Sequence, residues 1–312
     1  MAIEHRMIQT NGIRLHCAVD GNGPLVVLLH GIPESWRSWR HQLAALAPRF
    51  RVVAPDLRGM GESDKPEDVG AYGLAQAAAD VLGVIRACGE REAVIVGHDL
   101  GGAVAWTLAM EHPEAVRRLV VMNCPHPAVF QQHLRGDLRQ LARSWYMFFV
   151  QIPWLPETLL GAGGAWAVGQ AVRRSALRAD AIGDDDLREL RAAASQPGAL
   201  RGALNYYRAA FRSRDAAGAL PAVARRFIWG ERPPAGVRMT LEDWPRVRAP
   251  TLLVWGEHDV ALGKELTLGL EPLVAAPLSV RYVPSSGHWV QQEEPEIVNA
   301  HLLDFLCDLA PG

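Results

Sequence analysis

The sequence has few of the features that mark secreted, membrane-spanning or nucleic-acid-binding proteins. Its 312 residues include four cysteines, which are scattered and form no CxxC pair, so neither a disulfide framework nor a zinc knuckle is indicated. No apolar run approaches the roughly 18 residues of a membrane span. The formal net charge is −2, and no basic cluster is interleaved with aromatic residues. These absences predict no nucleic-acid partner, no membrane insertion and no metal site.

The beginning of the sequence also lacks the apolar core of a secretory signal, because it goes straight into strand-like sequence. We therefore expect a cytoplasmic protein with reduced cysteines. Apolar residues make up 49% of the chain and charged residues 21%. This composition is typical of a globular protein with enough apolar material for a large core.

Strand and helix signals alternate over residues 25–122, after a hairpin signal centred on Asn11 and Gly12. The alternation predicts an α/β fold in which helices flank a mostly parallel sheet, with ligands bound where the strands end. From residue 124 to 244 the sequence becomes helical, and its stretch Gly161–Gly164 is expected to join two helical segments. We therefore predict a core domain, 1–123 and 245–312, and a helical cap domain, 124–244, inserted before the last strands.

The most informative segment, Val96–Gly102, has the glycine spacing of a nucleophile elbow, which is a sharp turn from a strand to a helix. Asp99 stands where a hydrolase serine would sit. With a reference pKa near ~4, its carboxylate is ionised at neutral pH and attacks without a base. The alternative interpretation is a glycine-rich turn in which Asp99 only caps the helix.

Two further candidates stand at strand ends, in the chain order nucleophile, acid, histidine. Asp259 follows the strand signal at 251–256, and His288 follows the one at 280–283. Because parallel strands end at one edge of a sheet, we expect both residues to lie beside Asp99 and form a catalytic triad. In this triad His288, oriented by Asp259, would activate water.

These residues resemble the α/β-hydrolase superfamily and, within it, the epoxide hydrolase family with an aspartate nucleophile. Further marks are His30–Ser35, which follows an apolar strand signal, and the loop Pro55–Pro66. The resemblance covers nearly the whole chain and implies an α/β-hydrolase fold with eight strands. It also implies that an epoxide is converted to a vicinal diol with water and without a cofactor, through an alkyl ester on Asp99.

The resemblance also assigns residues around the triad. It points to the main-chain N–H groups of Ile32 and Leu100 as the oxyanion hole, which stabilises the charge that develops when water attacks the ester. Small hydrophobic substrates are expected, and the candidate binding residues are His30, Pro33, Trp36 and Trp289.

Two segments of the predicted cap, 144–151 and 204–208, resemble the tyrosine motifs of epoxide hydrolases. They match Tyr146 and Tyr207, which would donate hydrogen bonds and a proton to the epoxide oxygen, because a phenol with a pKa near ~10 stays protonated at neutral pH. The adjacent Tyr206 would face elsewhere on a helix and is expected to pack, although the choice between Tyr206 and Tyr207 stays open.

Leu100 departs from the family pattern, because many relatives have tryptophan directly after the nucleophile. In haloalkane dehalogenases that indole helps to bind the departing halide, so leucine disfavours this alternative, which shares the aspartate nucleophile. A non-catalytic receptor for a small ligand is the alternative from another class, and an intact triad counts against it. The identity of the epoxide and the oligomeric state, with a homodimer as one option, stay open.

Overall fold

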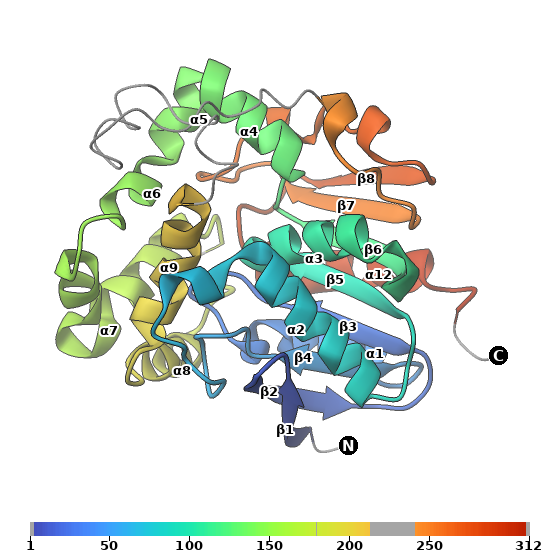
Figure 1. Ribbon diagram of the computed structural model, residues 1–312, viewed down its shortest axis with the longest axis horizontal. Helices are drawn as coiled ribbons and strands as arrows, with labels where there is room; N and C mark the ends of the chain where they lie inside the picture. The colour runs from blue at the N-terminus through green and yellow to red at the C-terminus, as the bar shows by residue number, and fades with distance from the viewer. Residues whose placement is uncertain (1–2, 179, 213–240, 310–312) are drawn as a thin grey trace.

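The computed structural model describes residues 3–178, 180–212 and 241–309, and Figure 1 shows its ribbon. In these ranges one sheet has the strand order β1-β2-β4-β3-β5-β6-β7-β8. The strands are β1 (Glu4–Thr10), β2 (Ile13–Asp20), β3 (Leu25–Leu29), β4 (Arg51–Pro55), β5 (Ala93–His98), β6 (Val116–Met122), β7 (Thr251–Gly256) and β8 (Leu278–Val283). Strand β2 is antiparallel to β1 and β4, and all other neighbours are parallel. The predicted eight-stranded, mostly parallel sheet is confirmed.

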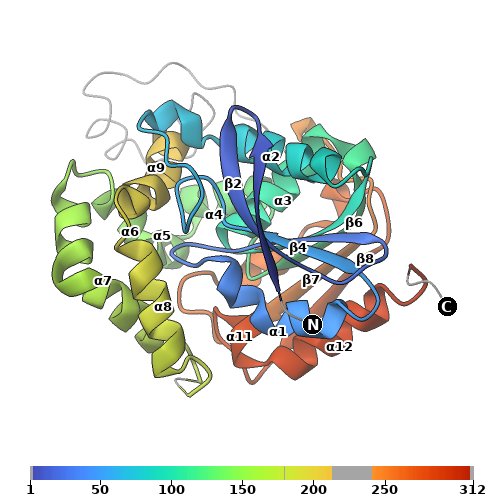
Figure 2. The same ribbon diagram turned by 90° about the horizontal axis from the view of Figure 1, so that it is seen from below.

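Helices cover both faces of this sheet (Figure 2). One face carries α2 (Leu74–Ala87) and α3 (Leu100–Glu111), and the other carries α1 (Arg40–Leu46), α11 (Val290–Glu293) and α12 (Pro295–Phe305). Alternate residues of a strand point to opposite faces. In β5, Ile95 therefore joins the apolar cluster beneath α2 and α3, whereas Val94 and Val96 join the cluster beneath α1 and α12. Strand β5 is buried throughout, which places its carboxyl end at the centre of the fold.

A helical region stands between β6 and β7 in the chain and lies to one side of the sheet in Figure 1. Its helices are α4 (Pro127–Gly136), α5 (Leu138–Arg143), α6 (Trp145–Phe149), α7 (Leu155–Ser175), α8 (Asp184–Ala194) and α9 (Ala199–Arg212). The region contacts loops at the carboxyl ends of strands. The Tyr206 hydroxyl donates to the main-chain carbonyl of Arg58, and the Trp289 indole N–H donates to Ser175. The division at residues 124 and 244 stays a prediction, and residues 213–240 of the predicted cap lie outside the described ranges.

Helix α7 is interrupted where the glycine-rich stretch predicts a joint. Residues 162–165 have non-helical backbone angles, and both Gly163 and Gly164 have positive φ, a region that glycine enters without a Cβ clash. Across the described ranges, we find no helix with the length and apolar character needed to cross a bilayer. The short 3₁₀ helices are η1 (Trp36–Trp39), η2 (Val69–Tyr72), η3 (Pro113–Ala115), η5 (Leu241–Asp243), η6 (Lys264–Thr267) and η7 (Glu271–Leu273).

Candidate active site

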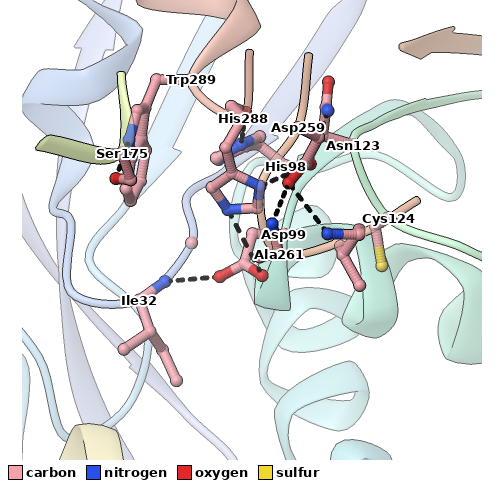
Figure 3. Close-up of polar contacts among 12 residues, drawn as sticks. Ile32, His98, Asp99, Asn123, Cys124, Ser175, Asp259, Ala261, His288 and Trp289 are labelled. Atoms are coloured by element: carbon pink, nitrogen blue, oxygen red, sulfur yellow. Dashed lines mark hydrogen bonds and ion pairs between the residues drawn. The ribbon is translucent and has the colours of Figure 1, made fainter. Parts of the chain in front are cut away.

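Asp99 lies on the sharp turn between β5 and α3 (Figure 3). Its backbone angles, φ 49° and ψ −119°, are unusual for a residue with a side chain. A Cβ atom on Gly97 would overlap the carbonyl of Gly101, and one on Gly101 would overlap the carbonyl of Leu29. The glycine spacing is therefore a steric requirement, and the predicted strand, turn and helix are confirmed.

Asp99, Asp259 and His288 converge at the carboxyl ends of β5, β7 and β8 (Figure 3). His288 Nδ1 lies 2.7 Å from Asp259 Oδ2, and its Nε2 lies 3.9 Å from Asp99 Oδ1. An ionised carboxylate can only accept a hydrogen bond, so Nδ1 donates to Asp259 and Nε2 is directed at Asp99. The structure thus brings the three predicted residues together in the order acid, histidine, nucleophile.

Asp259 is held by more donors than His288 alone. Its Oδ1 accepts the main-chain N–H groups of Ala261 and Leu262 at 2.8 and 2.9 Å, and its Oδ2 accepts the Asn123 side-chain amide at 2.7 Å. Asn123 itself accepts the N–H of Gly256 at 2.9 Å, which fixes its side-chain orientation. Our sequence analysis did not identify Asn123, although its place directly after β6 is a signal that could have found it.

The charges of this group set its protonation. Burial favours the neutral form of His288, but the charge and hydrogen bond of Asp259, together with the charge of Asp99, raise the pKa of His288 to about 9. Burial also favours the neutral form of Asp259, but the charge and hydrogen bonds of its partners, His288 first, lower its pKa below the usual value. At neutral pH the site therefore holds an imidazolium next to a carboxylate.

The main-chain N–H of Ile32 donates to Asp99 Oδ2 at 2.9 Å. Gly31 allows this close approach, since a Cβ there would lie 2.7 Å from the Asp99 Cβ. Leu100 is the first residue of α3, so its N–H has no helical acceptor. Of the two predicted oxyanion donors, the Ile32 N–H bonds directly to the Asp99 carboxylate, and the Leu100 N–H has no acceptor within α3.

Glu34 and His98 are buried side chains that hold the main chain at Gly31 and His288. Our sequence analysis did not identify them. His98 Nε2 donates to the His288 carbonyl at 2.8 Å, and its Nδ1 lies 3.0 Å from Glu34 Oε2. Glu34 also accepts the N–H of Gly31 at 2.9 Å. Burial opposes its ionisation, but His98 and Gly31 lower the pKa of Glu34. Their position beside Pro33 and Asp99 in the sequence was the signal that could have indicated this role.

Tyr146 on α6 and Tyr207 on α9 form a pair whose rings pack against each other. Their ring centroids are 5.6 Å apart, at an interplanar angle of 80°. Burial raises the pKa of both phenols well above the ordinary value, and the negative charge of Asp99 acts in the same direction on both, while Tyr146 adds to the rise for Tyr207. Both hydroxyls are therefore protonated donors at neutral pH. By contrast, the Tyr206 ring packs edge-on against Tyr72, and its hydroxyl donates to Arg58.

Comparisons with known proteins identify the family of this chain. Residues 24–295 match a family described as the alpha/beta hydrolase fold. Epoxide hydrolase 3 of Xenopus tropicalis is 35% identical over 96% of this chain and 76% of its own length, and epoxide hydrolase 4 of Homo sapiens is 34% identical over 96% and 77%. The chain belongs to the α/β-hydrolase fold family, in its epoxide hydrolase branch. The crystal structure of a Bacillus megaterium epoxide hydrolase with an inhibitor superimposes with a TM-score of 0.81, at 26% identity, and covers 97% of this chain and 100% of that one.

In this α/β hydrolase the four candidate binding residues have different surroundings. Pro33 lines a crevice with Met60 and residues of α8 and α9, and Trp289 lies 4.8 Å from His288, ring to ring. His30 is fully buried, with Nδ1 donating to the Gly31 carbonyl and Nε2 accepting the Leu57 N–H. Both of its ring nitrogens are paired with the main chain, and a contact between His30 and the substrate stays a prediction.

The Trp36 side chain packs between His5 and the core. Its ring meets the ring of His5 edge-on at 5.0 Å, and its main-chain N–H donates to Asp56 Oδ1 at 2.8 Å. The side chain packs against the apolar cluster beneath α1 and α12. These contacts hold Trp36 against the segment after Pro33, and a contact between Trp36 and the substrate stays a prediction.

Proposed function

We propose that the chain is an epoxide hydrolase, a hydrolase acting on ether bonds, which converts an epoxide to a vicinal diol through an ester on Asp99. The observation that carries the proposal is the position of the Asp99 carboxylate, which lies at the elbow, 3.9 Å from His288 Nε2. It is also near enough to Tyr146 and Tyr207 for its charge to raise the pKa of both phenols. A serine hydrolase has no use for a carboxylate at this position. The names of the curated relatives support the same activity.

The first half-reaction forms the ester. The Asp99 carboxylate attacks an epoxide carbon and the carbon–oxygen bond of the ring breaks, so negative charge develops on the epoxide oxygen. Tyr146 and Tyr207 donate hydrogen bonds to this oxygen, and one of them transfers its proton. Because an alkoxide is a far stronger base than a phenolate, this transfer lowers the barrier even though burial raises the pKa of both phenols.

The second half-reaction hydrolyses the ester. Esterification removes the negative charge of Asp99, which is one of the charges that raise the pKa of His288, so the imidazolium releases its proton more easily. This proton restores the phenol that was ionised in the first half-reaction. Neutral His288, held by Asp259, then takes a proton from water as the water oxygen attacks the ester carbonyl. The N–H groups of Ile32 and Leu100 stabilise the oxyanion, and its collapse expels the diol as an alkoxide, which takes a proton from His288. The proton of the Asp99 carboxyl group then passes to His288 and restores the resting state.

A product assay tests this function. The purified protein is incubated with styrene oxide, aliphatic epoxides and haloalkanes, and both diol and halide are measured, with Asp99→Asn as the control for background hydrolysis. Diol formation that depends on Asp99, without halide release, is the expected result. Halide release from haloalkanes without diol formation would replace the proposal with a dehalogenase activity. If neither diol nor halide forms, a ligand receptor is favoured.

A further inference from the structure

Glu293, at the end of α11, is a buried carboxylate that accepts main-chain N–H groups from two distant parts of the chain. Its side chain is almost without exposed surface, and the residue is 1% exposed. Oε2 accepts the N–H of Gly287 at 3.1 Å, and Oε1 accepts the N–H of Trp289 at 3.1 Å. These are the two neighbours of His288 in the sequence, so one carboxylate holds the main chain on both sides of this histidine.

The same carboxylate also reaches residues 175–178, which we call the cap strap because they end α7 and lead towards α8. Oε2 accepts the N–H groups of Leu177 and Arg178 at 3.0 and 3.2 Å. A second link lies next to it, since the Trp289 indole N–H donates to the Ser175 hydroxyl at 2.9 Å (Figure 3). The loop that carries His288 is therefore tied to the cap strap through two adjacent side chains.

We infer that Glu293 is a positioning residue for His288 that ties this base to the cap strap, an inference that rests on the proposed function. His288 has its carbonyl held by His98 at 2.8 Å, while Glu293 holds the amides on either side of it. Buried N–H groups need acceptors, so the loop keeps this conformation as long as the carboxylate is present. Because the same carboxylate also holds the cap strap, the position of His288 depends on how the helical region packs against the sheet.

An amide at this position cannot replace the carboxylate. Glu293→Gln has one oxygen and one NH₂ group, and the oxygen is best placed where Oε2 accepts three N–H groups. The NH₂ group then faces the N–H of Trp289, donor against donor, directly after His288. We expect the loop to shift and His288 to lose its alignment with the water and the ester carbonyl.

The test separates the two half-reactions in the full-length protein. Single-turnover experiments with excess enzyme and styrene oxide give the rate of ester formation on Asp99 and the rate of ester decay, each normalised to the amount of ester formed. In Glu293→Gln, ester decay should slow by about 10²-fold, because a small misplacement of a reacting group has an effect of this size. Ester formation, which does not use His288, should change little.

Two further variants complete the test. Glu294→Gln changes the adjacent residue of the same type, which contacts the Arg178 side chain of the cap strap but neither amide beside His288, and it should slow ester decay far less than Glu293→Gln. Ser175→Ala removes the acceptor of the Trp289 indole, together with the hydrogen bond from the Ser175 hydroxyl to the Val172 carbonyl within α7, and should slow ester decay by less, about 10-fold. It also keeps the test decisive if Glu293→Gln does not fold.

The outcomes distinguish this inference from the proposed function. Wild-type rates of ester decay in both Glu293→Gln and Ser175→Ala would overturn the inference, and so would an equal loss in both half-reactions. If the wild-type protein forms diol without any ester on Asp99, the proposed covalent mechanism has failed instead.

Discussion

Ile32 donates its main-chain N–H to the Asp99 carboxylate across 2.9 Å, so the proposed oxyanion donor already contacts the proposed nucleophile. The contact is made to Oδ2, whereas Oδ1 is the oxygen that lies 3.9 Å from His288 Nε2. This difference assigns Oδ1 as the attacking atom and Oδ2 as the future ester carbonyl. When water attacks that carbonyl, negative charge grows on Oδ2 with a donor already in place, which favours the transition state over the ester.

The tyrosine pair is the proton source in this account. Replacing Tyr146 or Tyr207 by Phe should slow ester formation by about 10²–10⁴-fold, the range of general acid catalysis, and the double replacement should slow it further. Stopped-flow or quench-flow measurement of the first half-reaction gives these rates. Tyr206→Phe is the matched control, because its hydroxyl donates to Arg58. Wild-type rates in the double variant would remove both tyrosines from the mechanism.

In the proposed mechanism His288 has no part in the attack on the epoxide, so its removal should leave a stable intermediate. In His288→Gln, ester formation continues while hydrolysis stalls. Mass spectrometry of the intact protein should then show one added substrate mass, located on the peptide that contains Asp99. His41→Gln, on helix α1, serves as the control and should turn over normally. An unmodified His288→Gln protein, or a substrate adduct on another peptide, is the result that this division of roles does not allow.

The pKa of His288 also predicts how stability changes with pH. In the folded protein this pKa is raised from 6.5 to about 9, so the charged histidine stabilises the fold fully below pH 6.5 and this contribution is lost as the pH rises to about 9. A shift of this size corresponds to a contribution on the order of 3 kcal/mol. The free energy of unfolding of wild-type protein, measured by urea denaturation, should therefore fall over this range relative to that of His288→Gln. Parallel pH profiles for the two proteins would show that His288 is not charged in the resting enzyme.

The fold and the triad could be predicted because their signals are local in the sequence. The glycine spacing around Asp99 is a steric requirement of one turn, and Asp259 and His288 each follow a strand whose apolar residues mark it. The supporting contacts could not be predicted in this way. Glu34 and His98 are 64 residues apart, and Glu293 and Leu177 are 116 apart. Only the packing of the sheet and the helical region brings these pairs together, and no short pattern records it.

The candidate binding residues show the same limit. His30 stands in a motif beside Ile32, and the resemblance to epoxide hydrolases suggested it as a binding residue. In the structure its ring bonds to the main chain at Gly31 and Leu57. A motif thus predicts that a residue is needed in a loop, but the direction of its side chain depends on the loops that pack against it.

The central claim is that Asp99 is a nucleophile, and the origin of the new diol oxygen tests it most directly. A single turnover is run in ¹⁸O-labelled water with enzyme in excess, and both the diol and the Asp99 peptide are analysed by mass spectrometry. The account predicts an unlabelled diol, because its oxygen comes from the carboxylate, and ¹⁸O in the Asp99 side chain, because water attacks the ester carbonyl. A labelled diol together with an unlabelled Asp99 would show that water attacks the epoxide directly, and it would contradict the covalent mechanism.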